Sequence, residues 1–334
     1  MRHCPESVQR LVQSLLEKHG APKGHAALQA DLLLEAELRG VASHGLQRLP
    51  LLLSRLNKGL INAHARGTGE WRRKALLCVD GERGFGPVVV MHTMERMQPV
   101  ARDAGIANAA IRNANHIGML AYYVEAAARS DLICLVMSTS EALVHPFGGT
   151  RALLGTNPLA IGIPTAEEPF VLDLATSIVS MGKINNHALR DEPIPAGWAV
   201  DAGGQATTDP NRAKDGAIAP FGGAKGYGLG LAIELLVATL AGSDVAPMVG
   251  GTLDDTRVAN KGDLLILIDP NSGSGSTSAL SAYLSQLRRS SPHDPANPVT
   301  VPGDRARARR AAALREGIDI PQPLFQQLTA LAAA

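Results

Sequence analysis

The chain has 334 residues, a net charge of +1 and a hydrophobic content of 45%, whereas aromatic residues make up only 3%. This length predicts about two domains, and the composition predicts a large core made mainly of aliphatic side chains. The near-zero charge provides no global field for nucleic acid, and the interleaved basic and aromatic residues that single-strand binding uses are missing, so we expect no nucleic-acid partner.

Cysteine usage and apolar stretches indicate the compartment. Cys4, Cys78 and Cys134 are far apart and form no Cys-x-x-Cys pair, so neither a redox motif nor a metal site is predicted. A sparse, odd count is typical of a reducing compartment. The start of the chain has no apolar signal core, and the longest apolar stretch, residues 226–241, is short for a membrane span and contains Glu234. We therefore expect a cytoplasmic protein with no membrane partner.

The first seventy residues have the periodicity of helices. Apolar residues at helical spacing predict one helix over residues 8–16 and a second over residues 28–36, which Gly40 closes. A third helix begins near residue 49 and ends at Lys58-Gly59.

The stretch from Ser43 to Arg48 leads into that third helix. If Ser43 is the N-cap, His44 and Arg48 lie four residues apart on one helix face. Pro50 favours a first turn, so the regular helix can instead begin near Arg48, with His44 in the turn before it.

Either arrangement suits the binding of a small acid. Arg48 can hold a carboxylate through two parallel hydrogen bonds, and His44 can pass a proton near neutral pH. The alternative is that Ser43 only caps a helix while His44 and Arg48 are solvated, because such helix starts are common.

Strands and helices mix from residue 75 onward without a regular βαβ rhythm. Short apolar runs predict strands at residues 75–80, 106–111, 132–137, 159–163, 170–174 and 264–268. Helical spacing predicts helices at residues 88–103, 120–129, 228–241 and 304–316. We therefore expect an α+β fold rather than a doubly wound one, with residues 1–72 and 290–334 forming a helical domain and residues 73–289 an α+β domain.

Glycine-rich turns lie next to polar groups at several junctions. His116 sits between a predicted strand and a predicted helix, where it can face a ligand or be purely structural. Residues 222–226, which include Lys225, open the long helix and can form either an anion cradle or a plain loop. The Rossmann fingerprint, the Walker A motif, His-Glu-x-x-His and Gly-x-Ser-x-Gly are all missing.

Seven short blocks, in their order and spacing, resemble the malate/L-lactate dehydrogenase family that lacks a Rossmann domain. This family includes sulfolactate dehydrogenase, ureidoglycolate dehydrogenase, diketogulonate reductase and piperideine/pyrroline-carboxylate reductase. The blocks are Ser43-His44-Gly45 with Arg48, Asn115-His116-Ile117-Gly118, Pro146-Phe147-Gly148-Gly149, Gly155-Thr156-Asn157-Pro158, Asp173-Leu174-Ala175-Thr176-Ser177, Thr207-Thr208-Asp209-Pro210 and Lys225-Gly226-Tyr227-Gly228-Leu229.

The resemblance implies the fold, the partners and the cofactor. It implies a helical domain formed by both ends of the chain and a mixed-sheet, non-Rossmann domain that binds NAD or NADP, as in L-sulfolactate dehydrogenase. It also implies a homodimer with the active site near the subunit interface, and a small carboxylate as the substrate.

The resemblance also implies residue roles. Arg48 and Thr156 would bind the substrate, and His44, with Ser43 beside it, would be the proton donor. His116 is the alternative acid/base, because family members differ in which histidine is named. The cofactor would contact His116, Ile117, Gly118, Met119, Leu120, Ser140, Asp173, Leu174, Ala175, Thr176, Ser177, Lys225, Gly226, Gly303 and Asp304.

Lys183 marks a departure from part of the family. The cyclic-imine reductases typically have Gly-Asp-Ile where this chain has Gly182-Lys183-Ile184, and that Asp joins the Ser–His relay. A Lys beside the substrate would favour a second anionic group. We therefore expect chemistry on a 2-oxo acid or 2-hydroxy acid of the malate, lactate or sulfolactate type.

Two other functions remain as alternatives. One is reduction of Δ1-piperideine-2-carboxylate or Δ1-pyrroline-2-carboxylate, which needs the same carboxylate grip. The other is a catalytically silent dimer that binds a nucleotide, against which the joint presence of Ser43, His44, Arg48 and His116 argues. The choice between NAD and NADP is open, since no Rossmann acidic residue is present to indicate it.

Overall fold

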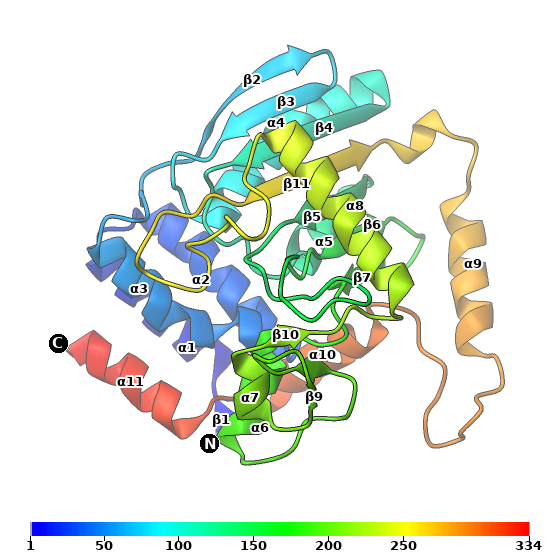
Figure 1. The fold of residues 1–334 in the computed structure, drawn as a ribbon. Coiled ribbons are helices and arrows are strands. Elements are labelled where there is room, and N and C mark those ends of the chain that lie inside the picture. The colour runs from blue at the N-terminus through cyan, green and yellow to red at the C-terminus, as the bar shows by residue number, and fades with distance from the viewer. Residues whose placement is uncertain (1, 334) are drawn as a thin grey trace.

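A seven-stranded mixed sheet forms the centre of the molecule (Figure 1), which the computed structural model describes over residues 2–333. Only β3 and β4 pair in parallel, and all other neighbouring strands are antiparallel. The order of the strands is β2 (Thr68–Arg73), β3 (Leu76–Asp80), β4 (Ile106–Arg112), β11 (Gly262–Ile268), β5 (Ile133–Ser138), β6 (Leu159–Ile163) and β7 (Phe170–Leu174).

Helices cover both faces of this sheet. Because side chains alternate along a strand, Ala109 and Ile111 of β4 join the core beneath α4 (Gly86–Ala104) and α5 (Ala121–Arg129). Ala110 points the other way and packs with Ile233 and Val237 of α8 (Ala224–Ala241).

The long helix α8 crosses the sheet diagonally in Figure 1. By length and composition alone it could span a membrane, but it packs on β4, β5 and β11. Its one carboxylate, Glu234, is buried and accepts hydrogen bonds from Asn157 Nδ2 at 2.6 Å and Ala246 N at 2.6 Å. The helix therefore behaves as a layer of this fold.

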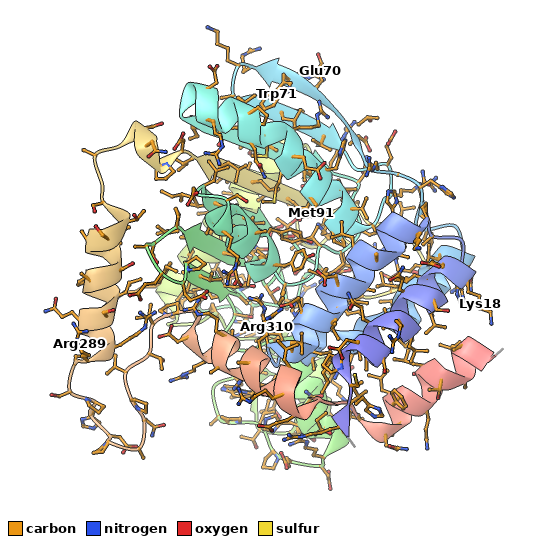
Figure 2. The ribbon with its side chains drawn as sticks, turned by 180° about the vertical axis from the view of Figure 1, so that it is seen from behind. Lys18, Glu70, Trp71, Met91, Arg289 and Arg310 are labelled. Carbon is orange, nitrogen blue, oxygen red and sulfur yellow. The ribbon has the colours of Figure 1, made fainter. Side chains whose placement is uncertain are left out.

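The two ends of the chain meet in a helical layer. A short antiparallel pair joins β1 (Arg2–His3) to β12 (Ile318–Asp319). Figure 2 shows Arg310 where a C-terminal helix meets an N-terminal one, and its guanidinium binds Glu35 at 2.7 Å. The helices of this layer are α1 (Pro5–Lys18), α2 (Lys23–Leu38), α3 (Leu49–Asn57), α10 (Asp304–Glu316) and α11 (Gln322–Ala333).

A small unit with its own core was not predicted from the sequence. It holds a three-stranded sheet in the order β10 (Ala217–Ile218), β8 (Ala199–Val200) and β9 (Ala206–Thr207), with α6 (Met181–Leu189) and α7 (Pro210–Lys214) beside it. Also unpredicted is α9 (Thr277–Arg288), which follows the short helix η3 (Pro270–Ser272) and stands apart from the sheet in Figure 1.

The mixture of helices with a mixed sheet confirms the α+β prediction. The predicted strands at residues 159–163 and 170–174 match β6 and β7 to the residue. The long helix begins at Ala224 rather than near residue 228, because Gly223, with φ of 62°, turns the chain directly into it.

Candidate active site

Two short 3-10 segments carry the stretch from Ser43 to Arg48. The first is η1 (Ala42–His44), the second is η2 (Leu46–Arg48), and α3 continues from Leu49. The regular helix therefore begins after Arg48, and His44 lies in the turn before it. Glu37 of α2 holds this turn, because its Oε1 accepts a hydrogen bond of 2.7 Å from Leu46 N.

His44 and His116 lie together although α3, β2, β3, α4 and β4 separate them in the chain. Their ring centroids are 5.4 Å apart and their planes are inclined at 30°. His44 Nδ1 meets Ser43 Oγ at 3.0 Å. His116 Nδ1 accepts a hydrogen bond of 3.1 Å from Gly118 N, so the neutral ring carries its proton on Nε2.

Burial and positive charge keep both rings neutral. Burial, and to a smaller extent the charge of Arg48, lowers the pKa of His44 to about 4. Burial also sets the pKa of His116 well below its ordinary value, and nearby cationic groups add to the effect. Both imidazoles are therefore neutral at pH 7 before any ligand arrives.

Arg48 is charged and free of protein partners in the described part of the chain. Burial lowers the pKa of its guanidinium to about 10, although the carboxylate of Glu141 opposes this effect, so the cation persists at pH 7. Among residues 2–333 its guanidinium makes no hydrogen bond or salt bridge with the protein. A half-buried, unpaired arginine is costly to keep without a ligand, and a carboxylate would satisfy it.

Two cavities meet at the histidine pair. The larger, of about 410 Å³, runs between α5, β7 and the start of α10. The smaller, of about 230 Å³, holds Arg48, His116 and the first turn of α6. Ser43, His44, Thr156 and Ser180 line both cavities, so together they form a continuous site of the size that small-molecule pockets have.

The structure brings several predicted cofactor residues to this site. Those on the larger cavity are Gly118, Met119, Leu120, Asp173, Leu174, Ala175 and Gly303, and Ser140 and His116 line the smaller one. Gly118 has φ of 74°, and a Cβ there would lie 2.4 Å from Leu32 Cδ2. The close packing of the β4–α5 turn against α2 therefore requires glycine at this position.

Other predicted residues do not line either cavity. Ile117, Thr176, Ser177, Lys225, Gly226 and Asp304 lie behind the lining or outside it. Thr176 is structural here, since its Oγ1 donates to Thr156 O at 2.9 Å. Asp304 binds Arg288 and Arg307. Lys183 is exposed, and its Nζ lies 4.9 Å from the centre of the Trp198 ring.

Asp173 is a carboxylate in the wall of the larger cavity. Its Oδ2 accepts a hydrogen bond of 2.8 Å from Ala121 N at the start of α5. Desolvation by the surrounding cavity wall raises the pKa of Asp173 to about 6, although backbone hydrogen bonds oppose this. Its side chain remains exposed to the cavity, so a ligand that donates a hydrogen bond can reach it.

Thr156 is held by a buried polar network. The next residue, Asn157, is fully buried, has φ of 31°, and donates from Nδ2 to Glu234 at 2.6 Å and to Gly230 O at 2.9 Å. A non-glycine residue in this region is strained and persists only when its surroundings fix it. The network thus ties the Thr156 turn to α8.

A buried ion pair lies at the start of β11, close enough to His116 to affect its pKa. Lys261 Nζ lies 2.5 Å from both carboxylate oxygens of Asp263, and Ser138 Oγ donates to the same carboxylate at 2.7 Å. Lys261 is among the charges that lower the pKa of His116. Lys261 therefore contributes positive potential at His116 without lining either cavity.

The sequence alone did not indicate several residues of the site. On the larger cavity these are Arg39, Glu125 and Arg307, and on the smaller one Glu141 and Asn185. Arg39 and Glu125 form a buried ion pair between α2 and α5. Sequence alone did not reveal these positions, because elements that are far apart in the chain come together to form the walls of both cavities.

The chain is similar to known dehydrogenases in both sequence and structure. The family model for malate/L-lactate dehydrogenase matches residues 4–329. A dehydrogenase structure from Sinorhizobium meliloti is 69% identical, with a TM-score of 0.97 and coverage of 99% of this chain and 98% of that one. The Δ1-piperideine-2-carboxylate reductase structure from Pseudomonas syringae pvar. tomato is 32% identical, with a TM-score of 0.89 and coverage of 99% of each chain.

Curated relatives have similar lengths. The L-sulfolactate dehydrogenase of Methanocaldococcus jannaschii is 36% identical over 97% of this chain and 94% of its own. A (2R)-3-sulfolactate dehydrogenase (NADP(+)) from Chromohalobacter salexigens is 33% identical, covering 97% and 96%. A ureidoglycolate dehydrogenase (NAD(+)) from Escherichia coli K12 is 33% identical, covering 98% and 95%.

Proposed function

The chain belongs to the malate/L-lactate dehydrogenase family, and on that premise we propose that it transfers a hydride between NAD(P)H and C2 of a small 2-oxo acid or 2-hydroxy acid. One observation carries this proposal. Arg48, which has no hydrogen-bonding partner for its guanidinium within residues 2–333, and a histidine pair line a cavity that continues into a second cavity large enough for part of a dinucleotide.

The protein's part in the reaction is to bind, orient and move a proton. Arg48 binds the substrate carboxylate through its two-pronged guanidinium and so fixes the position of C2. His44 gives a proton to the oxygen on C2 during reduction and takes it back during oxidation. When bound, the nicotinamide supplies or accepts the hydride. Thr156, on the edge shared by both cavities, completes the substrate-binding set.

The hydrogen bonds of the two rings favour His44 as the acid/base. Ser43 Oγ can either donate to or accept from His44 Nδ1, so the ring can change its protonation state without losing its partner. His116 Nδ1 can only accept from Gly118 N, which reserves Nε2–H as a hydrogen-bond donor. We therefore assign proton transfer to His44 with Ser43 beside it, and polarisation of the substrate oxygen or the nicotinamide amide to His116.

The chain's residues fit a dinucleotide in the larger cavity. The β4–α5 turn at residues 118–120, the β7 end at residues 173–175 and Gly303 at the start of α10 provide its walls. Helix starts such as that of α10 favour anionic groups. Relatives named for NAD(+) and for NADP(+) both exist, and the proposal covers both cofactors. We also propose that Lys225 and Gly226 contact the anionic part of the cofactor, although neither residue lines the two cavities of one chain.

We also propose a homodimer in the cytoplasm, with no nucleic-acid or membrane partner. The outer face of α8 and the loop after it expose large apolar side chains, among them Leu235, Leu236 and Met248. A patch of this kind usually marks an interface. Light scattering should give twice the mass of one chain, and Leu236→Glu should shift the population toward monomer; a wild-type monomer at micromolar concentration would contradict the dimer.

The reaction is tested with purified protein, NADH or NADPH, and a panel of acceptors. The panel holds pyruvate, oxaloacetate, sulfopyruvate, Δ1-piperideine-2-carboxylate and Δ1-pyrroline-2-carboxylate. Oxidation of the cofactor with a 2-oxo acid, lost in Arg48→Ala and kept in the exposed control Arg66→Ala, is the expected result. Turnover on the cyclic imines alone would show that the protein reduces cyclic imino acids instead. The similarity to a piperideine-carboxylate reductase structure is the reason for testing this alternative.

A further inference from the structure

The smaller cavity presents one cation and one anion to a substrate. Arg48 and Glu141 are the only charged side chains that line it within residues 2–333, since both histidines there are neutral at pH 7. Glu141 is close enough to Arg48 to raise its pKa. A substrate whose carboxylate binds Arg48 therefore meets a second carboxylate in the same cavity.

Hydrogen bonds from one loop fix the Glu141 carboxylate in place. Its Oε1 accepts from Thr252 N at 2.7 Å and from Leu253 N at 3.0 Å, and the Thr252 hydroxyl donates to its Oε2. A carboxylate offers about four acceptor positions and no donor. The side chain can therefore accept one further hydrogen bond, and it cannot turn away from the cavity without breaking three.

Within residues 2–333 no cation other than Arg48 lines this cavity. Arg55 is near enough to interact with Glu141, but its guanidinium lies outside the cavity and donates to Asp254 O, Arg257 O and Asn115 Oδ1. Lys183 was expected beside the substrate, but its ammonium group packs over Trp198 and does not line the cavity. A second carboxylate or a sulfonate on the substrate would thus face Glu141 with no further cation in the cavity to bind it, and such like-charge contacts in a partly buried site are unfavourable.

We propose that Glu141 selects the substrate class of this site: a monoanionic 2-oxo or 2-imino acid whose distal part donates a hydrogen bond to the Glu141 carboxylate. Dianionic acids such as oxaloacetate and sulfopyruvate are disfavoured. This inference rests on the proposed oxidoreductase function and narrows it. Arg48 recognises what all the candidate substrates share, and Glu141 discriminates among them.

The test compares the ratio of kcat/KM for pyruvate to that for oxaloacetate in wild type, Glu141→Gln and the exposed control Glu167→Gln. Gln keeps an acceptor for the loop but removes the charge. The wild-type ratio should favour pyruvate, and Glu141→Gln should shift it about tenfold toward oxaloacetate, while Glu167→Gln leaves it unchanged. A purely structural role for Glu141 would change both values by the same factor, which would overturn the inference, as would a wild-type preference for either dianion.

A binding measurement separates this inference from the proposed reaction. Quenching of bound NADH fluorescence reports binding of oxamate, a monoanion with an N–H donor, and of tartronate, a dianion. Oxamate should bind more tightly, and Glu141→Gln should reduce the difference. If no acceptor is turned over, the proposed function fails, but this comparison still decides the substrate class. The cyclic imines in the acceptor panel distinguish the oxo from the imino form of the substrate.

Discussion

His44 and His116 face one another with 5.4 Å between ring centroids, and Arg48 lies close enough to lower the pKa of both. Two imidazolium ions at this separation, next to a fixed guanidinium, would repel each other strongly. We therefore expect at most one of the two rings to be positively charged during the proposed reaction. Our proposal places the additional proton on His44, because the Ser43 hydroxyl beside its Nδ1 can either donate or accept a hydrogen bond.

The histidine pair leads to a prediction about separate mutants. His44→Ala should lower kcat about 10²- to 10⁴-fold, the usual contribution of a general acid/base, while the dissociation constant of NADH stays within about twofold. His116→Ala should raise the KM of the substrate and lower kcat less. Steady-state kinetics and fluorescence titration of NADH check both variants. A larger loss of kcat in His116→Ala would reverse the two assignments.

The lowered pKa of His44 predicts different pH profiles for the two reaction directions. Oxidation needs the neutral ring, which is already present above the pKa of about 4, so kcat/KM should stay flat from pH 6 to 8. Reduction needs the protonated ring, whose fraction falls about tenfold for each pH unit above the pKa. Reductive kcat/KM should therefore fall with pH across the same range. A flat reductive profile would exclude His44 as the proton donor.

Arg48 should not tolerate a conservative replacement. Arg48→Lys keeps the charge but loses the two parallel hydrogen bonds, so kcat/KM should fall about 10- to 100-fold, with binding of NADH unaffected. Arg66→Lys, at an exposed position, serves as the matched control. Equal kcat/KM in Arg48→Lys and wild type would show that the carboxylate binds elsewhere.

Gly45 should be essential to the turn that carries His44. A Cβ at Gly45 would lie 2.3 Å from Glu37 Oε1, so Glu37 would have to move and give up its hydrogen bond to Leu46 N. We expect Gly45→Ala to destabilise the fold by about 1–3 kcal/mol, as for a lost hydrogen bond to a charged group, and to lower kcat. Gly24→Ala, with no atom within 4 Å of the added Cβ, should be neutral or slightly stabilising. Urea unfolding compares the two variants, and similar midpoints would contradict the prediction.

Glu37 should make stability depend on pH. Burial raises the pKa of Glu37 from 4.5 to about 7, although the Leu46 N–H hydrogen bond opposes this. The native state thus binds this proton more tightly than the unfolded chain, so stability is highest below about pH 4.5 and falls as pH rises through 7. Glu37→Gln, which cannot ionise, should be more stable than wild type by about 1–3 kcal/mol at pH 8 and nearly equal at pH 5. Urea titrations at both pH values measure this, and an equal difference at the two would contradict it.

The sequence predicted the elements whose signal is local. The strands β6 and β7 are apolar runs bounded by turn residues, so their limits were predicted correctly. The edge strand β2 has the polar sequence Thr68–Arg73 and owes its extended form to pairing with β3, which no local pattern reveals. The helix α9 follows a Gly/Ser-rich loop and buries only Ser281, so it lacks the apolar stripe that periodicity detects.

The residues of the candidate site also fall into those that local sequence indicates and those whose roles depend on distant contacts. Ser43, His44 and Arg48 are close in sequence and could be grouped from their spacing, and the family resemblance added His116 and Thr156. Glu141 could not be assigned in advance, because its role depends on the loop at residues 252–253. Lys183 was expected near the substrate from one sequence position, whereas its packing on Trp198 depends on the small unit around α6.

The position of β11 has a consequence for biosynthesis. This strand lies between β4 and β5, so a growing chain has both of those strands long before the one that joins them. Until β11 emerges from the ribosome, β4 and β5 each have an unpaired edge that can bind other extended chains. We therefore expect nascent chains that end before residue 262 to depend on chaperones, and His116, in the turn that follows β4, to reach its final position only late in synthesis.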